Sequence, residues 1–183
     1  MKKQNETNEN MTREMLLKRM ADAYYELLAA IAPLLQKNGD IEDGIREGLN
    51  KFLSNLCIVL VGKEETDFYS EDALRELTKD KPEHLVYEHM IPKNYYQGEI
   101  VDDFKAGKIK NADDIKAVLE KYWYIATITS TEDEQLDPPR SVPKGWDDQD
   151  IFVRYGSIKD RLTPRAACRG AAFPVKCQRC KNK

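Results

Sequence analysis

The chain has 183 residues and a formal net charge of −3 at pH 7, a length that predicts one well-buried domain rather than two separate cores. Charged residues make up 33% of it and the mean hydropathy is −0.67, which is typical of a polar globular protein. The longest apolar run is far shorter than the roughly 20 residues of a transmembrane helix, and the polar start lacks the apolar stretch of a secretory signal. With four cysteines, these features predict reduced thiols, a cytoplasmic location and no membrane partner.

The first third of the chain predicts a pair of helices. Residues 1–10 are rich in Asn, Glu and Lys without an apolar anchor, so we expect them to be disordered. Thr12 can cap a helix whose apolar residues recur at spacings of three and four over residues 16–35. A second helix opens at Asp40, with an apolar face over residues 41–56. The short connection between them predicts an antiparallel pair with a structural role.

The centre of the chain contains several short elements. Ser70 can cap a short helix, and residues 85–91 fit either a strand or the start of a helix that Pro92 closes. A further short helix is expected at residues 101–104.

A helix and a strand are predicted next. Asn111 caps a helix over residues 112–121, and residues 122–129 form the strongest β-forming run of the chain. The four residues Ser130 to Asp133 match a capping box that begins another short helix.

These elements predict an α+β fold that is mainly helical, with an N-terminal antiparallel helix pair, a small central β element and an irregular basic C-terminal arm. The domain organisation we expect is a disordered N-terminus at 1–10, a single mainly helical α+β domain at 11–158, and a basic, Cys-containing arm at 159–183.

Charge is concentrated in the C-terminal arm. Residues 159–183 contain eight Lys or Arg against the single Asp160, so the arm carries +7 and the remaining 158 residues carry −10. An acidic body with a basic arm suggests contact with phosphates or with an acidic protein surface, while a merely solubilising arm is the alternative. The residues that we expect to bind nucleic acid are Arg165, Arg169, Lys176 and Arg179.

The same arm holds Cys168, Cys177 and Cys180, with the two-residue spacing of a zinc knuckle between the last two. A Zn²⁺ site here needs a fourth ligand, which His84 or a partner chain can supply. Cys57 is expected in the core instead. The alternative is that the cysteines of the arm are simply exposed thiols.

One stretch points to chemistry. Glu88 and His89 follow an apolar run and precede Pro92, and this acidic-His-x-x-Pro string resembles the opening of the His-Asn-His (HNH) nucleases. The resemblance implies that Glu88 and Asp133 bind a divalent metal, Mg²⁺ or Mn²⁺, that His89 activates the attacking water, and that Lys93 steadies the phosphate. The alternative is that Glu88 and His89 form a hydrogen-bonded pair that fixes a turn.

A second resemblance covers more of the chain. Glu-His-x-x-Pro, then Glu-Asp-x-x-Leu, Pro-x-Gly-Trp-Asp and Arg-Tyr occur in the same order in a family of uncharacterised bacterial and phage proteins. This resemblance spans His84 to Tyr155 and includes Trp146 and Arg154. It implies that these residues form one site or one packing motif, and it brings no established activity.

Two functions therefore follow from the sequence. The first is metal-dependent hydrolysis of nucleic-acid phosphodiesters, on DNA or RNA, at a degenerate HNH-like site. The alternative is a non-enzymatic bacterial or phage protein that binds a macromolecular partner, a nucleic acid or a protein, through its acidic body or its basic arm. Convergence of Glu88, His89 and Asp133 on one point is what the nuclease requires and the binding protein does not.

Overall fold

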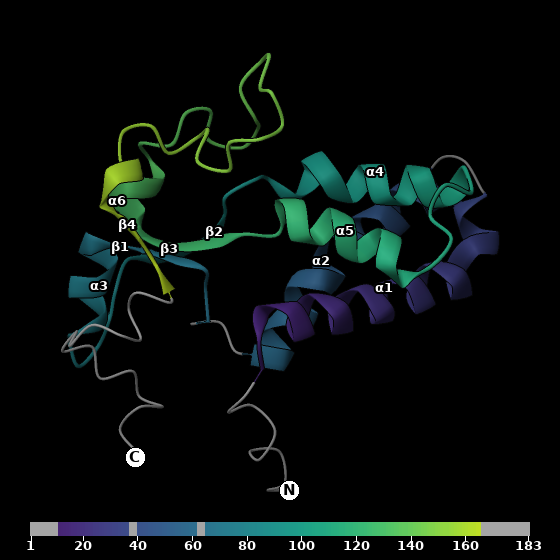
Figure 1. Ribbon diagram of the computed structural model, residues 1–183, viewed down its shortest axis with the longest axis horizontal. Helices are drawn as coiled ribbons and strands as arrows, with labels where there is room; N and C mark the ends of the chain where they lie inside the picture. Colours follow the sequence, from purple (N-terminus) through teal and green to yellow (C-terminus); the bar gives the residue numbers. More distant parts are fainter. Residues whose placement is uncertain (1–10, 37–39, 62–64, 166–183) are drawn as a thin grey trace, which may run out of the picture. The chain divides into compact units, whose positions relative to one another are not determined.

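The computed structural model describes residues 11–36, 40–61 and 65–165. Their contacts group into two compact units. We call the first, from residues up to 65 and from 93–123, the helical unit; the second, from residues 66–92 and from 124 onward, is the β unit (Figure 1). The sequence predicted one domain over 11–158, whereas the contacts divide that range into these two units, with residues 93–123 inserted between parts of the β unit.

The helical unit contains α1 (Arg13–Leu35), α2 (Asp40–Val61), α4 (Lys93–Lys105) and α5 (Ala112–Tyr122). Thr12 caps α1 as expected, since its hydroxyl accepts a hydrogen bond from the Met15 amide at 3.2 Å. Asn111 caps α5 through a reciprocal capping box with Asp114. The predicted N-terminal helix pair is therefore confirmed.

The core of the helical unit is made of apolar side chains from all four helices. Its fully buried members include Leu17, Met20, Leu53, Ile115 and Leu119. The apolar face predicted for α1 is confirmed where it is fully buried, at Met20, Tyr24, Leu28 and Leu35. It differs in that Leu17 and Ala21 are buried as well, while the predicted members Leu16, Leu27 and Ile31 are only half-buried. The reason is that α1 packs against both α2 and α5, which widens and turns the face that it buries.

The β unit is built on a four-stranded sheet in the order β2-β3-β1-β4. The strands are β1 (Phe68–Ser70), β2 (Leu85–His89), β3 (Ile125–Thr129) and β4 (Leu162–Pro164), and the helices are α3 (Glu71–Leu77), α6 (Ser130–Asp133) and the 3₁₀ helix η1 (Lys159–Arg161). Strand β3 pairs parallel with β1 and antiparallel with β2, while β4 pairs antiparallel with β1.

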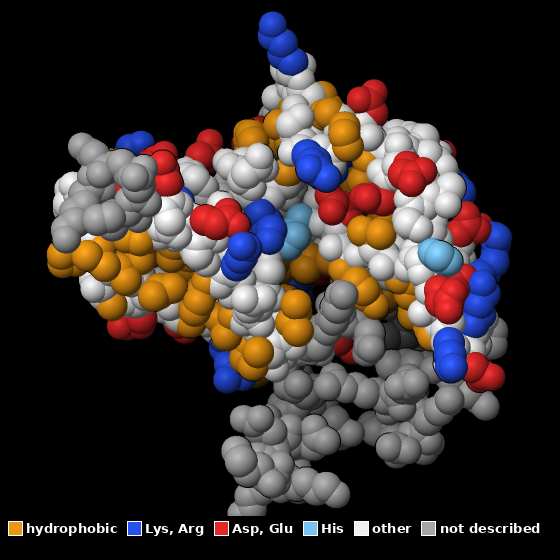
Figure 2. Space-filling model, turned by 180° about the vertical axis from the view of Figure 1, so that it is seen from behind, with side chains coloured by type: hydrophobic (Ala, Val, Ile, Leu, Met, Phe, Trp, Pro, Cys, Tyr) orange, Lys and Arg blue, Asp and Glu red, His pale blue; other side chains and the backbone are white. Residues whose placement is uncertain are grey.

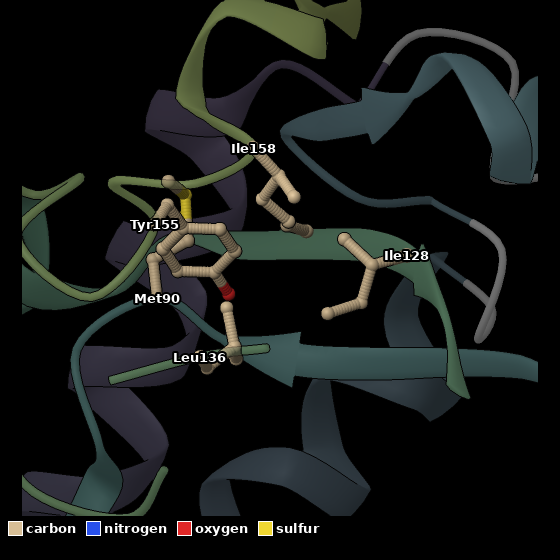
Figure 3. Close-up of a cluster of buried hydrophobic side chains, with 6 residues drawn as sticks. Met90, Ile128, Leu136, Tyr155 and Ile158 are labelled. Carbon is tan, nitrogen blue, oxygen red and sulfur yellow. The ribbon is translucent and has the colours of Figure 1, made fainter. Parts of the chain in front are cut away.

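One face of this sheet carries the apolar core of the unit. Ala126 and Ile128 of β3 are fully buried against Met90, Leu136, Tyr155 and Ile158, as Figure 3 shows for the labelled side chains. The last three come from the segment between α6 and η1, which has neither helix nor strand. This irregular segment, residues 134–158, therefore covers the sheet and completes its core.

The mainly helical α+β fold predicted from the sequence is confirmed, with three local differences. Helix α4 begins at Lys93, directly after Pro92, rather than at residue 101. The helix after β3 is capped by Thr129 with Glu132, one residue earlier than expected. The predicted arm at 159–183 is not irregular at its start, because residues 159–164 form η1 and β4 and complete the sheet.

Leu53→Ala should lower the free energy of unfolding by about 2 to 5 kcal/mol, because Leu53 is fully buried in the helical unit. Leu27→Ala removes the same atoms from a half-buried position and should cost clearly less. Urea denaturation of the two variants measures both values. Equal losses would contradict the half-buried position of Leu27.

Candidate functional site

The centre of the β unit is a buried arginine. Arg154 lies in the irregular segment, and none of its side chain is exposed, although a guanidinium keeps its charge in any protein environment. Its Nε donates to the Pro138 carbonyl at 2.9 Å, and Nη1 donates to the His89 carbonyl at 3.0 Å and to that of Met90 at 3.4 Å. Nη2 donates to Glu88 Oε1 at 2.9 Å and to the Pro139 carbonyl.

These bonds join parts of the chain that are 15 to 66 residues apart. The end of β2 and the first residues of the irregular segment are both held by one planar group. The Glu88 carboxylate supplies the compensating negative charge that a buried cation needs. Arg154 therefore holds two parts of the irregular segment, its own position and residues 138–139, at the end of β2.

Glu88 and His89 are placed differently by the strand that carries them. Successive side chains of a strand leave it on opposite faces. Glu88 pairs with Ala126 across β2 and β3, and thus lies on the core face, whereas His89 pairs with Ile125 and lies on the other face. The carboxylate is also in an ion pair with Arg154. This arrangement favours a structural role for Glu88 as the countercharge of Arg154, whereas the alternative stated from the sequence paired it with His89.

Asp133, the second expected metal ligand, is the last residue of α6. Burial raises the pKa of the Tyr155 phenol, with a smaller upward contribution from the charge of Glu88 and a further one from Asp133, against a downward one from Arg154. Glu88 and Asp133 therefore both add to the raised pKa of this phenol.

The neighbouring Glu132 completes the capping box of α6, which the sequence placed one residue later, at Ser130. Its Oε2 accepts hydrogen bonds from the Ser70 hydroxyl at 2.6 Å and from the Thr129 amide at 2.9 Å. Ser70 at the same time caps α3 through the Ala73 amide. One buried carboxylate thus links the starts of two helices, which holds α6 and Asp133 in place.

Lys93 belongs to the helical unit. It is the first residue of α4, and its Nζ donates to the Ser54 hydroxyl at 3.1 Å and to the Asn50 carbonyl at 3.4 Å. Of the residues expected to bind nucleic acid, Arg165 is described, and its amide donates to the Asp67 carbonyl at 2.8 Å. The others lie outside the described residues: Arg169, Lys176, Arg179 and the zinc candidates Cys168, Cys177 and Cys180.

The described residues contain no group of three or more His, Cys, Asp and Glu side chains placed to hold one metal ion. Glu88 is already paired with a fixed cation, and His89 leaves the strand on the face opposite to Glu88. To bind Mg²⁺ or Mn²⁺, the Glu88 carboxylate would have to leave its ion pair with Arg154. The metal site stays a prediction from the resemblance.

Comparisons of the chain with protein-family models, with curated proteins and with solved structures found no match. None of the described helices combines the length and the apolar composition needed to cross a membrane.

Arg154→Met should lower the free energy of unfolding by about 3 to 5 kcal/mol, because it leaves Glu88 without its countercharge and removes the donors to four carbonyls. Glu88→Gln in the same chain should recover part of that loss. Arg75→Met is the matched control, since its exposed side chain makes only surface ion pairs within α3 and should change stability by about 0.5 kcal/mol or less. Denaturant titration measures all three, and equal stability of Arg154→Met and Arg75→Met would contradict the anchoring role.

Tyr155→Phe should leave stability at pH 7 unchanged or raise it, because the phenolic oxygen is buried without a hydrogen-bond partner among the described residues. Burial raises the pKa of this phenol above its ordinary 10.0, so the stability it contributes is complete below pH 10 and falls as the pH rises further. Tyr155→Phe should therefore lose less stability than the wild type between pH 9 and about 11. Thermal denaturation across this range tests it, and a large loss at pH 7 would show that the hydroxyl is bonded.

Proposed function

We propose that the protein is a non-enzymatic binding protein whose β unit presents the irregular segment to a macromolecular partner. The observation that carries the proposal is the Arg154 anchor. Arg154 forms an ion pair with Glu88, the carboxylate that the nuclease hypothesis needs as a metal ligand. It also holds the base of the irregular segment, which contains neither helix nor strand.

The length and the order of the irregular segment support this role. Loops beyond about 12 to 15 residues without secondary structure are uncommon in compact domains and are often functional. Here the base is tied down by the Asp137 amide, which donates to the Arg154 carbonyl at 3.2 Å. Farther along, Trp146 Nε1 donates to the Asp150 carbonyl at 3.1 Å. A rigid scaffold that displays an ordered loop is a common arrangement for recognition.

The basic arm favours a partner that carries phosphates, because its sequence carries +7 and continues from β4 of the same unit. In the irregular segment Arg140 and Lys144 are exposed, but they share it with the acidic residues Glu134, Asp137, Asp147, Asp148 and Asp150. On the rest of the described surface too, Lys and Arg lie beside Asp and Glu, as Figure 2 shows for one face. Many of these charges are paired, for example Lys18 with Asp22 at 2.8 Å, which reduces their attraction for a partner. We therefore expect a nucleic-acid partner in preference to a protein.

Metal-dependent hydrolysis of nucleic acid is the competing proposal. It is supported by the resemblance of the Glu88-His89 string to the HNH nucleases. It requires a rearrangement that frees Glu88 from Arg154.

The decisive assay incubates the full chain with labelled duplex DNA, single-stranded DNA and an RNA hairpin, with Mg²⁺, Mn²⁺ or EDTA. We expect salt-sensitive binding to at least one probe and no cleavage. Arg140→Ala/Lys144→Ala should weaken binding, whereas Lys51→Ala, which removes an exposed lysine from α2, should not. Truncation after Arg165 keeps β4, removes five positive charges and should flatten the salt dependence.

Two results would overturn this proposal. Metal-dependent cleavage that is lost in EDTA and in His89→Ala would establish the hydrolase instead. Binding that is the same in the Arg140→Ala/Lys144→Ala variant and in the wild type would exclude the irregular segment as the recognition element.

A further inference from the structure

Helices α1 and α2 carry matching apolar stripes. On each helix, apolar residues recur at alternating spacings of four and three, which is the repeat with which helices pack along a seam. On α1 they are Leu16, Met20, Ala23, Leu27, Ala30 and Leu34, and on α2 they are Ile45, Leu49, Phe52, Leu56 and Val59. We call these residues together the α1–α2 seam.

Most of the seam is accessible to solvent. Met20 and Leu49 are buried, whereas the other members are half-buried or exposed, with 41% of Leu34 and 77% of Val59 accessible. Figure 2 shows a band of hydrophobic side chains on the helical unit, at the left of the view. Contiguous apolar surface of this kind commonly marks the binding site of another macromolecule.

The contacts of the other two helices show which flank of α1 and of α2 the seam occupies. Lys18 of α1 pairs with Asp113 of α5 at 3.3 Å, and Arg46 of α2 pairs with Asp102 of α4 at 2.5 Å. With 3.6 residues per turn, the seam is centred about 160° around α1 from Lys18 and about 100° around α2 from Arg46. Since α1 also packs against α2, the two stripes adjoin on the side turned away from α4 and α5.

Two charges beside the seam indicate which partner it fits. Arg19 and Glu26 are exposed, and neither forms an ion pair within the part of the chain that the structure describes. They directly precede the seam residues Met20 and Leu27, so both lie on the outer margin of the stripe. Arg19 is four residues before Ala23, and Glu26 is three residues after it. A second α1 that crosses antiparallel at Ala23 therefore places Arg19 of each copy opposite Glu26 of the other.

The same crossing point suits α2. The rings of Tyr24 and Phe52 stack with their centroids 6.0 Å apart, so Phe52 lies level with this part of α1. Phe52 is also the middle one of the five seam residues of α2. A two-fold axis beside Ala23 therefore passes close to Phe52, and it brings Ile45 of one copy opposite Val59 of the other.

We infer that the α1–α2 seam is the interface of a symmetric homodimer, in which α1 packs antiparallel on α1 and α2 on α2 of a second copy. The two seams form the apolar core of a four-helix bundle, and the two Arg19–Glu26 pairs border it. The corresponding margin of α2 carries Gly48 and Asn55, so no like charges meet there. This interface belongs to the helical unit and does not depend on the function proposed for the β unit.

The first test places a charge in the seam. Val59→Lys alters the most exposed seam position, and Ile58→Lys is the matched control, because Ile58 is 46% exposed on the same helix but lies off the seam. Sedimentation velocity over a dilution series of the full chain measures the dissociation constant of the dimer. Val59→Lys should raise it by about a hundredfold or more, because the interface contains each residue twice, whereas Ile58→Lys should dimerise as the wild type does.

The second test is specific for the antiparallel crossing at Ala23. Arg19→Glu and Glu26→Arg each set like charges against each other at two places, and each should weaken the dimer by about tenfold at low salt. The double variant Arg19→Glu/Glu26→Arg exchanges the charges and restores both pairs, so its dissociation constant should return to that of the wild type. Circular dichroism checks that every variant keeps its helices.

Three results would overturn the inference. The first is a wild-type chain that stays monomeric at the highest concentration reached. The second is equal weakening by Val59→Lys and Ile58→Lys, which would mean unspecific apolar association. The third is a double charge variant as weak as the single ones, which would exclude the antiparallel crossing. None of these results bears on nucleic-acid binding by the β unit, so the two proposals fail separately.

Discussion

The β unit depends on one requirement, that the charge of Arg154 be satisfied where it is buried. A guanidinium does not lose its proton on burial, so its donors and its charge need partners in place. Glu88 supplies the charge, and backbone carbonyls of the irregular segment and of the end of β2 accept the remaining hydrogen bonds. Those carbonyls can meet one planar group only if the segment folds back over the sheet. The apolar cover provided by Leu136 and Tyr155 follows from that placement.

The features that could be predicted from the sequence are those set by residues close together in it, such as helix caps. Ser70 and Asn111 cap their helices as expected, because an N-cap needs only a short polar side chain and the amides two or three residues onward. The general α+β class followed in the same way from the spacing of apolar residues. Even so, the cap of α6 differed by one residue: Thr129 and Ser130 both suit the position, and the long-range bond of Glu132 to Ser70 accompanies the choice of Thr129.

The role of Arg154 was not available from local patterns. Four of its hydrogen bonds are to backbone carbonyls, which every residue carries, so no complementary side chain marks those partners in the sequence. The pairing with Glu88 is 66 residues distant. The resemblance that included Arg154 and Tyr155 implied one site or one packing motif, and it named no partner for Arg154. What the sequence presented as a catalytic dipeptide is, for Glu88, a countercharge.

Helix α4 is a second element that local sequence patterns did not predict in full. Its first half was missed because an amphipathic helix is recognised by apolar residues on its inner face, and the buried residues there are Tyr96 and the polar Gln97. A sequence that is locally inconsistent with its own fold loses stability there, and such positions tend to coincide with function. An apolar inner face would have made α4 both easier to predict and better packed against α2. A polar side chain buried at this position, Gln97, is therefore what hides the first half of the helix from sequence patterns.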